Sequence, residues 1–234
     1  MNKEEFLKET QKLNIKVTDT MLFQLETYAD FLLKYNEHTN LTAIKTKEEV
    51  YLKHFYDSLT LIKIENLEKG SLLDVGTGAG FPGLVLATVF PNLKVTLLDS
   101  NNKKITFLKE CIKKLNLKNV ETVYSRAEDY TRVHREEYDF VTSRAVADLR
   151  ILLELNIPAL KIKGHFLVMK GNVNEELEKA KQTMRILSSK IMKQEIFELP
   201  NQGGLRTLVS IEKEKSTDLK YPRTYDKIKK KEIS

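Results

Sequence analysis

The feature that most restricts the fold of this 234-residue chain is a glycine-rich turn placed directly after a short apolar run. The segment reads Leu73-Asp74-Val75-Gly76-Thr77-Gly78-Ala79-Gly80-Phe81-Pro82-Gly83. Glycines at alternate positions let the backbone turn sharply and leave bare main chain beside a ligand, because a Cβ would clash there and would disfavour positive φ. With Pro82 placed to open a helix, the segment predicts a strand, a ligand-binding turn and a helix in succession.

From residue 71 onward, short apolar runs alternate with amphipathic segments, which is typical of a parallel sheet with crossover helices. The pattern predicts strands at 72–75, 95–98, 120–124, 140–142, 166–169, 191–197 and 208–211. Helices are predicted at about 105–115, 151–160 and 175–187. This rhythm predicts an α/β fold, namely a doubly wound, mostly parallel seven-stranded sheet of the Rossmann-like type.

The two ends of the chain differ from this pattern. Apolar residues at helical spacing predict helices before residue 70, with stripes at Leu22, Leu25, Ala29 and Leu32 and at Tyr51, Phe55, Leu59 and Ile62. At the end of the chain Lys227, Lys229, Lys230 and Lys231 lie close together, and we expect this part of the tail to be mobile. The chain is therefore divided into an N-terminal helical extension, 1–70, a cofactor-binding domain, 71–213, and a basic C-terminal tail, 214–234.

Two residues of the turn indicate which cofactor it holds. A dinucleotide fingerprint needs Gly or Ala where this chain has Phe81. The carboxylate of Asp74 would repel a pyrophosphate, but it suits a ligand that carries an ammonium and a sulfonium group. The turn therefore favours S-adenosylmethionine.

Further polar residues follow the next two predicted strands. Asp99 lies about 20 residues after the turn, where a carboxylate accepts hydrogen bonds from ribose hydroxyls. A polar loop at 125–129 is placed to meet the adenine edge. Asp99 could instead cap a helix and Glu128 could be a surface charge, but the ordered set favours cofactor binding. The residues predicted from this pattern to surround the cofactor are Asp74, Gly76, Thr77, Gly78, Gly80, Asp99 and Ser100.

Composition limits the remaining possibilities. Against 39 Lys and Arg there are 33 Asp and Glu, and this charge of +6 favours polyanionic partners, although a solvated basic surface explains it equally well. A single cysteine, Cys111, excludes an internal disulfide and a multi-cysteine zinc cluster, and no metal site is predicted. Because the sequence shows neither a signal peptide nor an apolar run of about 20 residues, we expect a cytoplasmic protein.

These motifs occur together in a known family. Over most of its length the chain resembles the small-subunit ribosomal RNA guanine-N7 methyltransferases of type G, long called glucose-inhibited division protein B. The resemblance rests on Asn40-Leu41-Thr42-Ala43-Ile44, His54-Phe55-Tyr56-Asp57-Ser58-Leu59, Asp74 to Gly83, Ser143-Arg144-Ala145, Lys170-Gly171, Arg206 and Tyr221-Pro222-Arg223. After this last motif the family commonly continues with a glycine and prolines, whereas this chain continues with lysines.

The resemblance implies a class I S-adenosylmethionine methyltransferase that methylates guanine N7 in the 16S ribosomal RNA of the small subunit. It implies cofactor contacts at Gly76, Phe81, Ala127, Glu128 and Arg144. Residues expected at the RNA site are His54, Asp57, Lys170, Arg206 and Arg223. Guanine N7 has an in-plane lone pair and no proton, so the enzyme has only to align it with the methyl group, and no catalytic base is predicted.

Three of these residues have simpler explanations. Arg144 ends the predicted fourth strand, where it could meet phosphate, base or cofactor, or only form a salt bridge. His54 and Asp57 are one helical turn apart, so they could pair with each other or line the floor of an RNA site.

Other chemistries lack their characteristic residues. A cytosine C5 methyltransferase needs a cysteine nucleophile, but Cys111 is expected inside a helix among apolar neighbours. An adenine amino methyltransferase usually has Asn or Asp followed by two prolines after the fourth strand, where this chain has Thr142-Ser143-Arg144-Ala145. A small-molecule methyltransferase and a non-catalytic RNA-binding module remain as alternatives. The basic tail argues against a small-molecule methyltransferase. The intact glycine turn argues against a non-catalytic module. We expect the protein to act as a monomer.

Overall fold

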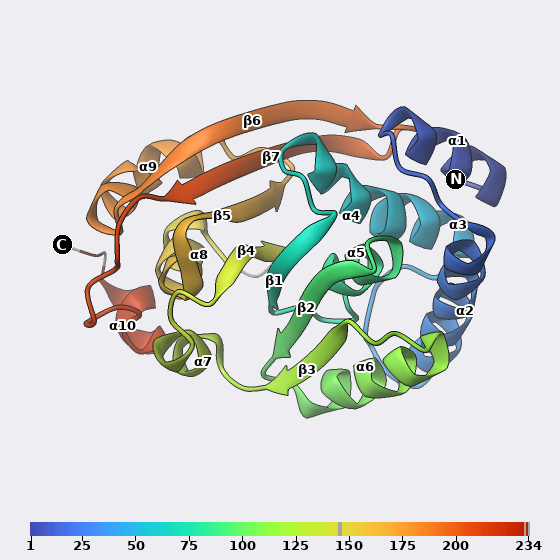
Figure 1. The fold of residues 1–234 in the computed structure, drawn as a ribbon, viewed down its shortest axis with the longest axis horizontal. Coiled ribbons are helices and arrows are strands. Elements are labelled where there is room, and N and C mark those ends of the chain that lie inside the picture. The colour runs from blue at the N-terminus through green and yellow to red at the C-terminus, as the bar shows by residue number, and fades with distance from the viewer. Residues whose placement is uncertain (145–146, 232, 234) are drawn as a thin grey trace.

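The structure is a computed structural model that describes residues 1–144, 147–231 and 233. Ala145, part of one motif above, and Glu232 of the tail lie outside the described residues. The described part of the chain forms one seven-stranded sheet between two layers of helices (Figure 1). Within it, no helix is long and apolar enough to cross a membrane.

The sheet has the strand order β3-β2-β1-β4-β5-β7-β6. The pairs β1–β2, β1–β4, β2–β3 and β4–β5 are parallel, whereas β7 runs antiparallel to both β5 and β6. This confirms the predicted doubly wound, mostly parallel sheet. The strands are β1 Lys69–Val75, β2 Asn92–Asp99, β3 Val120–Tyr124, β4 Tyr138–Arg144, β5 Leu160–Lys170, β6 Ser189–Leu199 and β7 Gly204–Lys213.

Several strands are longer than predicted. The prediction for β5 began at residue 166, but the strand begins at Leu160. Its first half carries Lys161 and Lys163, which are exposed, so no apolar run marks it in the sequence. Apolar patterning reveals the buried part of a strand and misses the part that extends into solvent.

The helices divide between the two faces of the sheet. They are α1 Lys3–Lys12, α2 Asp19–Asn36, α3 Lys47–Glu49, the π-helix η1 Val50–Tyr56, α4 Asp57–Leu59, the 3-10 helix η2 Thr60–Lys63, α5 Gly83–Val89, α6 Asn102–Leu115, α7 Ala127–Val133, α8 Leu149–Asn156, the 3-10 helix η3 Ile157–Ala159, α9 Asn174–Ile186 and α10 Tyr225–Lys230. Leu72 packs with the layer of α2, α5 and α6, and Leu73 with that of α8 and α9, because alternate residues of a strand face opposite ways.

The N-terminal helices are part of the main core. Tyr28 of α2 and Phe55 of η1 are fully buried and belong to the same apolar cluster as Leu72 of β1. The Tyr28 hydroxyl donates a hydrogen bond to the carbonyl oxygen of Ala79, in the glycine turn, at 2.5 Å. The side chain of Thr18 caps α2 by accepting from the amide of Met21, which fixes where this helix begins.

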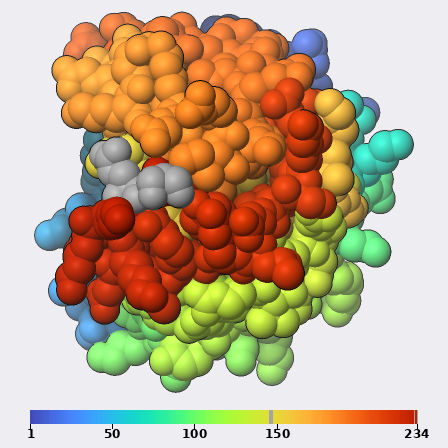
Figure 2. All heavy atoms as spheres, turned by 90° about the vertical axis from the view of Figure 1, so that its left-hand side faces the viewer, coloured from blue at the N-terminus to red at the C-terminus, as the bar shows by residue number. Residues whose placement is uncertain are grey.

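The C-terminal tail is ordered against the sheet's second helical layer, contrary to our expectation. Residues 214–231 pack beside α7 and α8 and include α10 (Figure 2). Tyr221 and Ile228 are buried there, and Arg223 pairs with Glu154 of α8. Buried apolar side chains, this ion pair and hydrogen bonds from Arg132 and Arg135 to the backbone hold the segment, and such anchors do not form a periodic pattern in the sequence.

Candidate functional site

The glycine turn connects β1 to α5 at the carboxyl edge of the sheet. Gly76, Gly78 and Gly80 have φ values of 70°, 62° and 101°, in the region that favours glycine. A Cβ on Gly78 would meet nothing within 4 Å, whereas a Cβ on Gly80 would come within 2.6 Å of the Tyr28 hydroxyl. Gly78 therefore faces the open side of the turn, and Gly80 allows α2 to pack closely behind it.

Asp74 is buried beneath this turn. Its Oδ2 accepts hydrogen bonds from the Thr77 hydroxyl at 2.7 Å and from the Gly83 amide at 2.8 Å. Its Oδ1 is buried without a hydrogen-bond partner, and burial raises the pKa of the carboxyl to about 6. A cationic group would compensate this buried charge, so the turn fits the ammonium and sulfonium groups of S-adenosylmethionine.

Asp99 ends β2 and lies beside the turn, as predicted. Its Oδ2 accepts from the Gly78 amide at 3.0 Å, and its Oδ1 accepts from the Asn101 amide at 2.8 Å. Because a carboxylate oxygen can accept two hydrogen bonds, both Asp99 oxygens can still receive a ribose hydroxyl. The N-cap of α6 is Asn101, whose side chain accepts from the Lys103 amide. Ser100 follows Asp99 and is exposed.

The next strand brings the polar loop to the same edge. Arg126 is the N-cap residue of α7, which begins with Ala127 and Glu128. The buried Glu128 accepts a hydrogen bond from Arg126 Nε at 3.3 Å. Because β1, β2 and β3 are adjacent and parallel, the turn, Asp99 and Glu128 follow one another along one edge, where ligands bind in such sheets.

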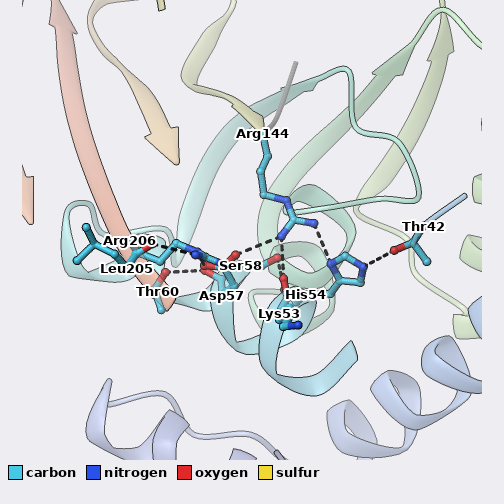
Figure 3. A network of polar contacts seen from close by, with 9 residues as sticks. All are labelled: Thr42, Lys53, His54, Asp57, Ser58, Thr60, Arg144, Leu205 and Arg206. Atoms are coloured by element: carbon cyan, nitrogen blue, oxygen red, sulfur yellow. Dashed lines mark hydrogen bonds and ion pairs between the residues drawn. The ribbon is translucent and has the colours of Figure 1, made fainter. Parts of the chain in front are cut away.

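Arg144, at the end of β4, is the centre of a second polar cluster (Figure 3). Its Nη2 donates to His54 Nδ1 at 3.0 Å, and its Nη1 donates to the Lys53 carbonyl oxygen at 3.1 Å. The same Nη1 lies 3.4 Å from Asp57 Oδ2. His54 Nε2 is 3.0 Å from the Thr42 hydroxyl. His54 and Asp57, which could have paired with each other, both contact Arg144 instead.

The π-helix η1 explains how one arginine reaches three partners on one segment. In an α-helix the Lys53 carbonyl oxygen would accept from the amide of Asp57. Here the Asp57 amide donates to the carbonyl oxygens of His54 and Leu52. The Lys53 oxygen is left to accept from Arg144. Single π-helical turns are frequent at functional sites.

Phe81 joins the two polar clusters. The His54 ring stacks on it with centroids 4.0 Å apart, and Arg144 Cζ lies 5.3 Å from its centroid. Burial, together with the Arg144 cation, lowers the pKa of His54 to about 3. The imidazole is therefore neutral at neutral pH. Since Nδ1 accepts from Arg144, the proton is on Nε2, which donates to Thr42.

A cavity of about 480 Å³ opens beside this cluster. Its lining is Lys53, His54, Asp57, Arg144, Met169, Lys170, Gly171, Asn172, Glu176 and Arg206. Arg206 Nε donates to Asp57 Oδ1 at 2.9 Å, and Lys170 Nζ lies 2.6 Å from a Glu176 carboxylate oxygen. Four cationic side chains against two carboxylates make the cavity suitable for an anionic ligand.

The structure gathers most of the predicted site residues. His54, Asp57, Lys170 and Arg206, all expected at the RNA site, line this cavity. Arg223 lies elsewhere, paired with Glu154 of α8. The residues predicted to hold the cofactor lie at the ends of β1, β2, β3 and β4.

Sequence reasoning did not assign a role to Thr42, Lys53 or Glu176. Thr42 stands in one of the motifs that carry the family resemblance, which was its only signal. Lys53 contributes its backbone oxygen to the cluster, and a pattern of side chains cannot predict such a contact. Glu176 is one of several charges in the first turn of α9, so the sequence does not distinguish it.

Comparison with known proteins identifies the family. The profile of the family rRNA small subunit methyltransferase G, GidB, matches residues 21–202. The chain belongs to this family. A ribosomal RNA small subunit methyltransferase G of Alkaliphilus metalliredigens is 45% identical over 217 residues, covering 91% of each chain. One of Pediococcus pentosaceus is 46% identical over 230 residues, covering 95% of each. Membership makes the protein an S-adenosylmethionine-dependent methyltransferase.

Solved structures share the fold. The TYW2 protein of M. jannaschii in complex with AdoMet aligns with a TM-score of 0.55 at 19% identity, covering 67% of this chain and 74% of that one. A precorrin-6y C5,15-methyltransferase of Geobacter metallireducens aligns with a TM-score of 0.53 at 18% identity, covering 75% and 91%. The class I methyltransferase fold expected from the sequence is confirmed.

Proposed function

We propose that this protein transfers the methyl group of S-adenosylmethionine to N7 of a guanine in the 16S ribosomal RNA of the small subunit. The relatives that span nearly the whole chain are small subunit ribosomal RNA methyltransferases. Because ribosomal RNA is the proposed substrate, we infer that the protein acts in the cytoplasm. One chain carries both candidate sites, so we also infer that it acts as a monomer.

The observation that carries the proposal is the cationic cavity beside the glycine turn. The cavity has four cationic side chains in its lining, and its inner wall, His54 and Arg144, rests on Phe81 of the turn. An RNA strand needs cations for its phosphates and a recess for the target base. A base placed in this cavity would lie next to the end of the cofactor site.

The reaction requires guanine N7 and the methyl group to be aligned, but it requires no general base to remove a proton. When bound, S-adenosylmethionine would supply an electrophilic methyl group. Guanine N7 would attack the methyl carbon with its own lone pair in an in-line displacement that breaks the carbon–sulfur bond and releases S-adenosylhomocysteine. Both nitrogens of His54 are engaged, Nδ1 with Arg144 and Nε2 with Thr42, so the ring is held as a rigid neutral wall. Arg144 keeps its positive charge between that wall and Asp57, where it can donate to a phosphate or to the guanine O6 edge.

The cofactor residues complete the proposal. Asp74 accepts the cationic end of the methyl donor, Asp99 accepts the ribose hydroxyls, and the loop that begins with Ala127 and Glu128 holds the adenine. Gly78 gives the ligand close access to the main chain, since its outer face is open.

The test is methylation of small subunits that lack the modification. Purified protein and isotope-labelled S-adenosylmethionine should place label on one guanine of 16S RNA, mapped by nuclease digestion and mass spectrometry. An RNA substrate in which that guanine is replaced by 7-deazaguanine should accept no label, because the attacking nitrogen is missing. Label on an exocyclic amine or a ring carbon, or transfer only to small molecules, would contradict the proposal.

A further inference from the structure

Residues 214–231 form a strap that runs from the end of β7 across the outer surface of α7 and α8. Figure 2 shows these residues, in red, lying between the orange segment that includes α9 and the yellow-green segment around α7. The arginines of α7 and the following turn hold the strap by its backbone. Arg132 Nη2 donates to the Pro222 oxygen at 2.9 Å, and Arg135 Nη1 donates to the Tyr221 oxygen at 2.6 Å.

An ion pair with a buried carboxylate fixes the strap to α8. Arg223 donates from Nε to Glu154 Oε1 at 2.8 Å and from Nη2 to Oε2 at 2.7 Å. The Arg223 amide also donates to Glu154 Oε1. Glu154 is only 1% exposed, and its hydrogen bonds raise the pKa of Arg223. A bidentate pair on a buried carboxylate fixes both the position and the orientation of the arginine. The residues that follow Arg223 therefore begin at a fixed place on α8.

Tyr225, the first residue of α10, reaches from this point to the polar loop at residues 125–129, which we call the cofactor loop. Arg126 Cζ lies 5.1 Å from the centroid of the Tyr225 ring, within the range of a cation–π contact. Arg126 also donates to Glu128 at 3.3 Å. The contacts thus run from Tyr225 through Arg126 to Glu128, the buried carboxylate at the start of α7.

Helix α7 needs support from outside itself. It has seven residues, and helices this short are unstable in isolation. No side chain caps its N-terminus, because its N-cap residue is Arg126. The strap contacts α7 near both ends, through Tyr225 at its start and through Arg132 near its end.

We propose that the strap positions the cofactor loop, with Tyr225 as a positioning residue that holds Arg126, and through it Glu128, in the geometry that receives the adenosine. The inference rests on the proposed function in one respect, namely that Glu128 contacts the cofactor. Tyr225 touches neither cofactor nor RNA in this role. It sets the affinity for the methyl donor by limiting the arrangements that the loop adopts before binding.

The test is calorimetric binding of S-adenosylhomocysteine to the full-length protein and its variants. Replacing the ring in Tyr225→Leu should raise the Kd about threefold to fivefold, the size expected for a half-exposed cation–π contact. Tyr225→Phe keeps the ring over Arg126 and should bind like the wild type. Phe197→Leu is the matched control, because Lys63 lies 5.0 Å over that half-buried ring away from the cofactor loop. It should leave the Kd unchanged.

Two further measurements separate the possible failures. Glu128→Ala should weaken binding by more than Tyr225→Leu does, and an unchanged Kd would overturn both the proposed contact and this inference. If Glu128→Ala weakens binding but Tyr225→Leu does not, or if Tyr225→Phe is as weak as Tyr225→Leu, the strap inference alone is wrong. Amide hydrogen exchange of residues 127–131 without cofactor should be faster in Tyr225→Leu than in Tyr225→Phe.

Discussion

Arg144 and His54, which are 90 residues apart in sequence, share a 3.0 Å hydrogen bond in which the guanidinium donates to Nδ1. The bond requires an unprotonated Nδ1, so the arginine and a protonated imidazole exclude each other at this contact. The end of β4 and the π-helix are thus joined by a link that depends on the protonation of the histidine.

We expect this link to make stability depend on pH. His54 has a pKa near 3 in the folded protein and about 6.5 when unfolded, so between these values the unfolded chain binds one more proton. The contribution of His54 to the free energy of unfolding should therefore fall as the pH decreases from about 6.5 towards 3, whereas Asp74, whose pKa is raised to about 6 in the folded protein, contributes in the opposite direction over part of this range. His54→Gln lacks the titrating group, so its denaturant-measured stability should fall less steeply over this range. Parallel pH profiles for the two proteins would contradict the assignment.

Two glycines of the turn should respond differently to alanine. Gly78→Ala adds a methyl group on the open side, so we expect at least a tenfold loss of cofactor affinity and a cost of about 1 to 2 kcal/mol for the positive φ. Gly80→Ala places a Cβ 2.6 Å from the Tyr28 hydroxyl and 2.9 Å from Leu84 Cβ, so it should be the more destabilised protein. Thermal unfolding and calorimetry of both variants measure the contrast. The same loss of stability in both would show that Gly78 is not on an open face.

Removing the cation of Arg206 should weaken RNA binding without changing the cofactor site. Arg206→Gln should bind 16S RNA about tenfold more weakly and lower the slope of log K against log salt by about one. Lys190→Gln is a control on the neighbouring strand, because Lys190 is exposed and paired with Glu214. The readouts are filter binding over a salt series and calorimetry with S-adenosylhomocysteine. Loss of cofactor affinity in Arg206→Gln would place Arg206 at the other site.

The lysines at the end of the strap offer a second group of phosphate contacts. Lys229, Lys230 and Lys231 line a hollow of about 240 Å³ together with residues of α8 and α9. Changing all three to Gln should weaken RNA binding and reduce the salt slope by up to about three, with cofactor affinity unaltered. Lys109, Lys113 and Lys118, which are exposed on and after α6, provide a triple control of equal charge. Equal salt slopes in the wild type and the Lys229–231 variant would mean that these lysines are only solvated.

Cys111 should be dispensable for catalysis. It is fully buried in α6, and burial raises the pKa of its thiol, so it has neither access to substrate nor thiolate character. Cys111→Ala should methylate RNA at a near-normal rate and lose about 1 kcal/mol of stability for the space left behind. A loss of more than about tenfold in kcat at unchanged stability would indicate covalent catalysis.

The sheet and the glycine turn were predictable because both depend on local sequence. Buried parallel strands require runs of apolar residues, and the turn requires glycine at positions of positive φ. Asp74 and Asp99 then follow from their places at strand ends. These features could be located without knowing which distant residues meet.

The second polar cluster was only partly predictable. The motifs of the resemblance placed His54, Asp57 and Arg144 at the site, but not the bonds between them, because those bonds join η1 to β4 through space. The π-helix was not foreseen, since its spacing of apolar residues resembles that of an α-helix over so short a length. The strap was missed because Glu154, one of its anchors, looks in the sequence like an ordinary charge on α8, and only the fold brings Arg223 beside it.

The contact between Tyr28 and the glycine turn has a consequence for recombining this protein with its relatives. The Tyr28 ring stacks on Phe81, its hydroxyl binds the Ala79 oxygen, and it occupies the space that a side chain at position 80 would need. Helix α2 and the turn are therefore a matched pair. A chimera that joins the first 70 residues of one homologue to the remainder of another should keep its cofactor affinity only where both parents agree at these positions.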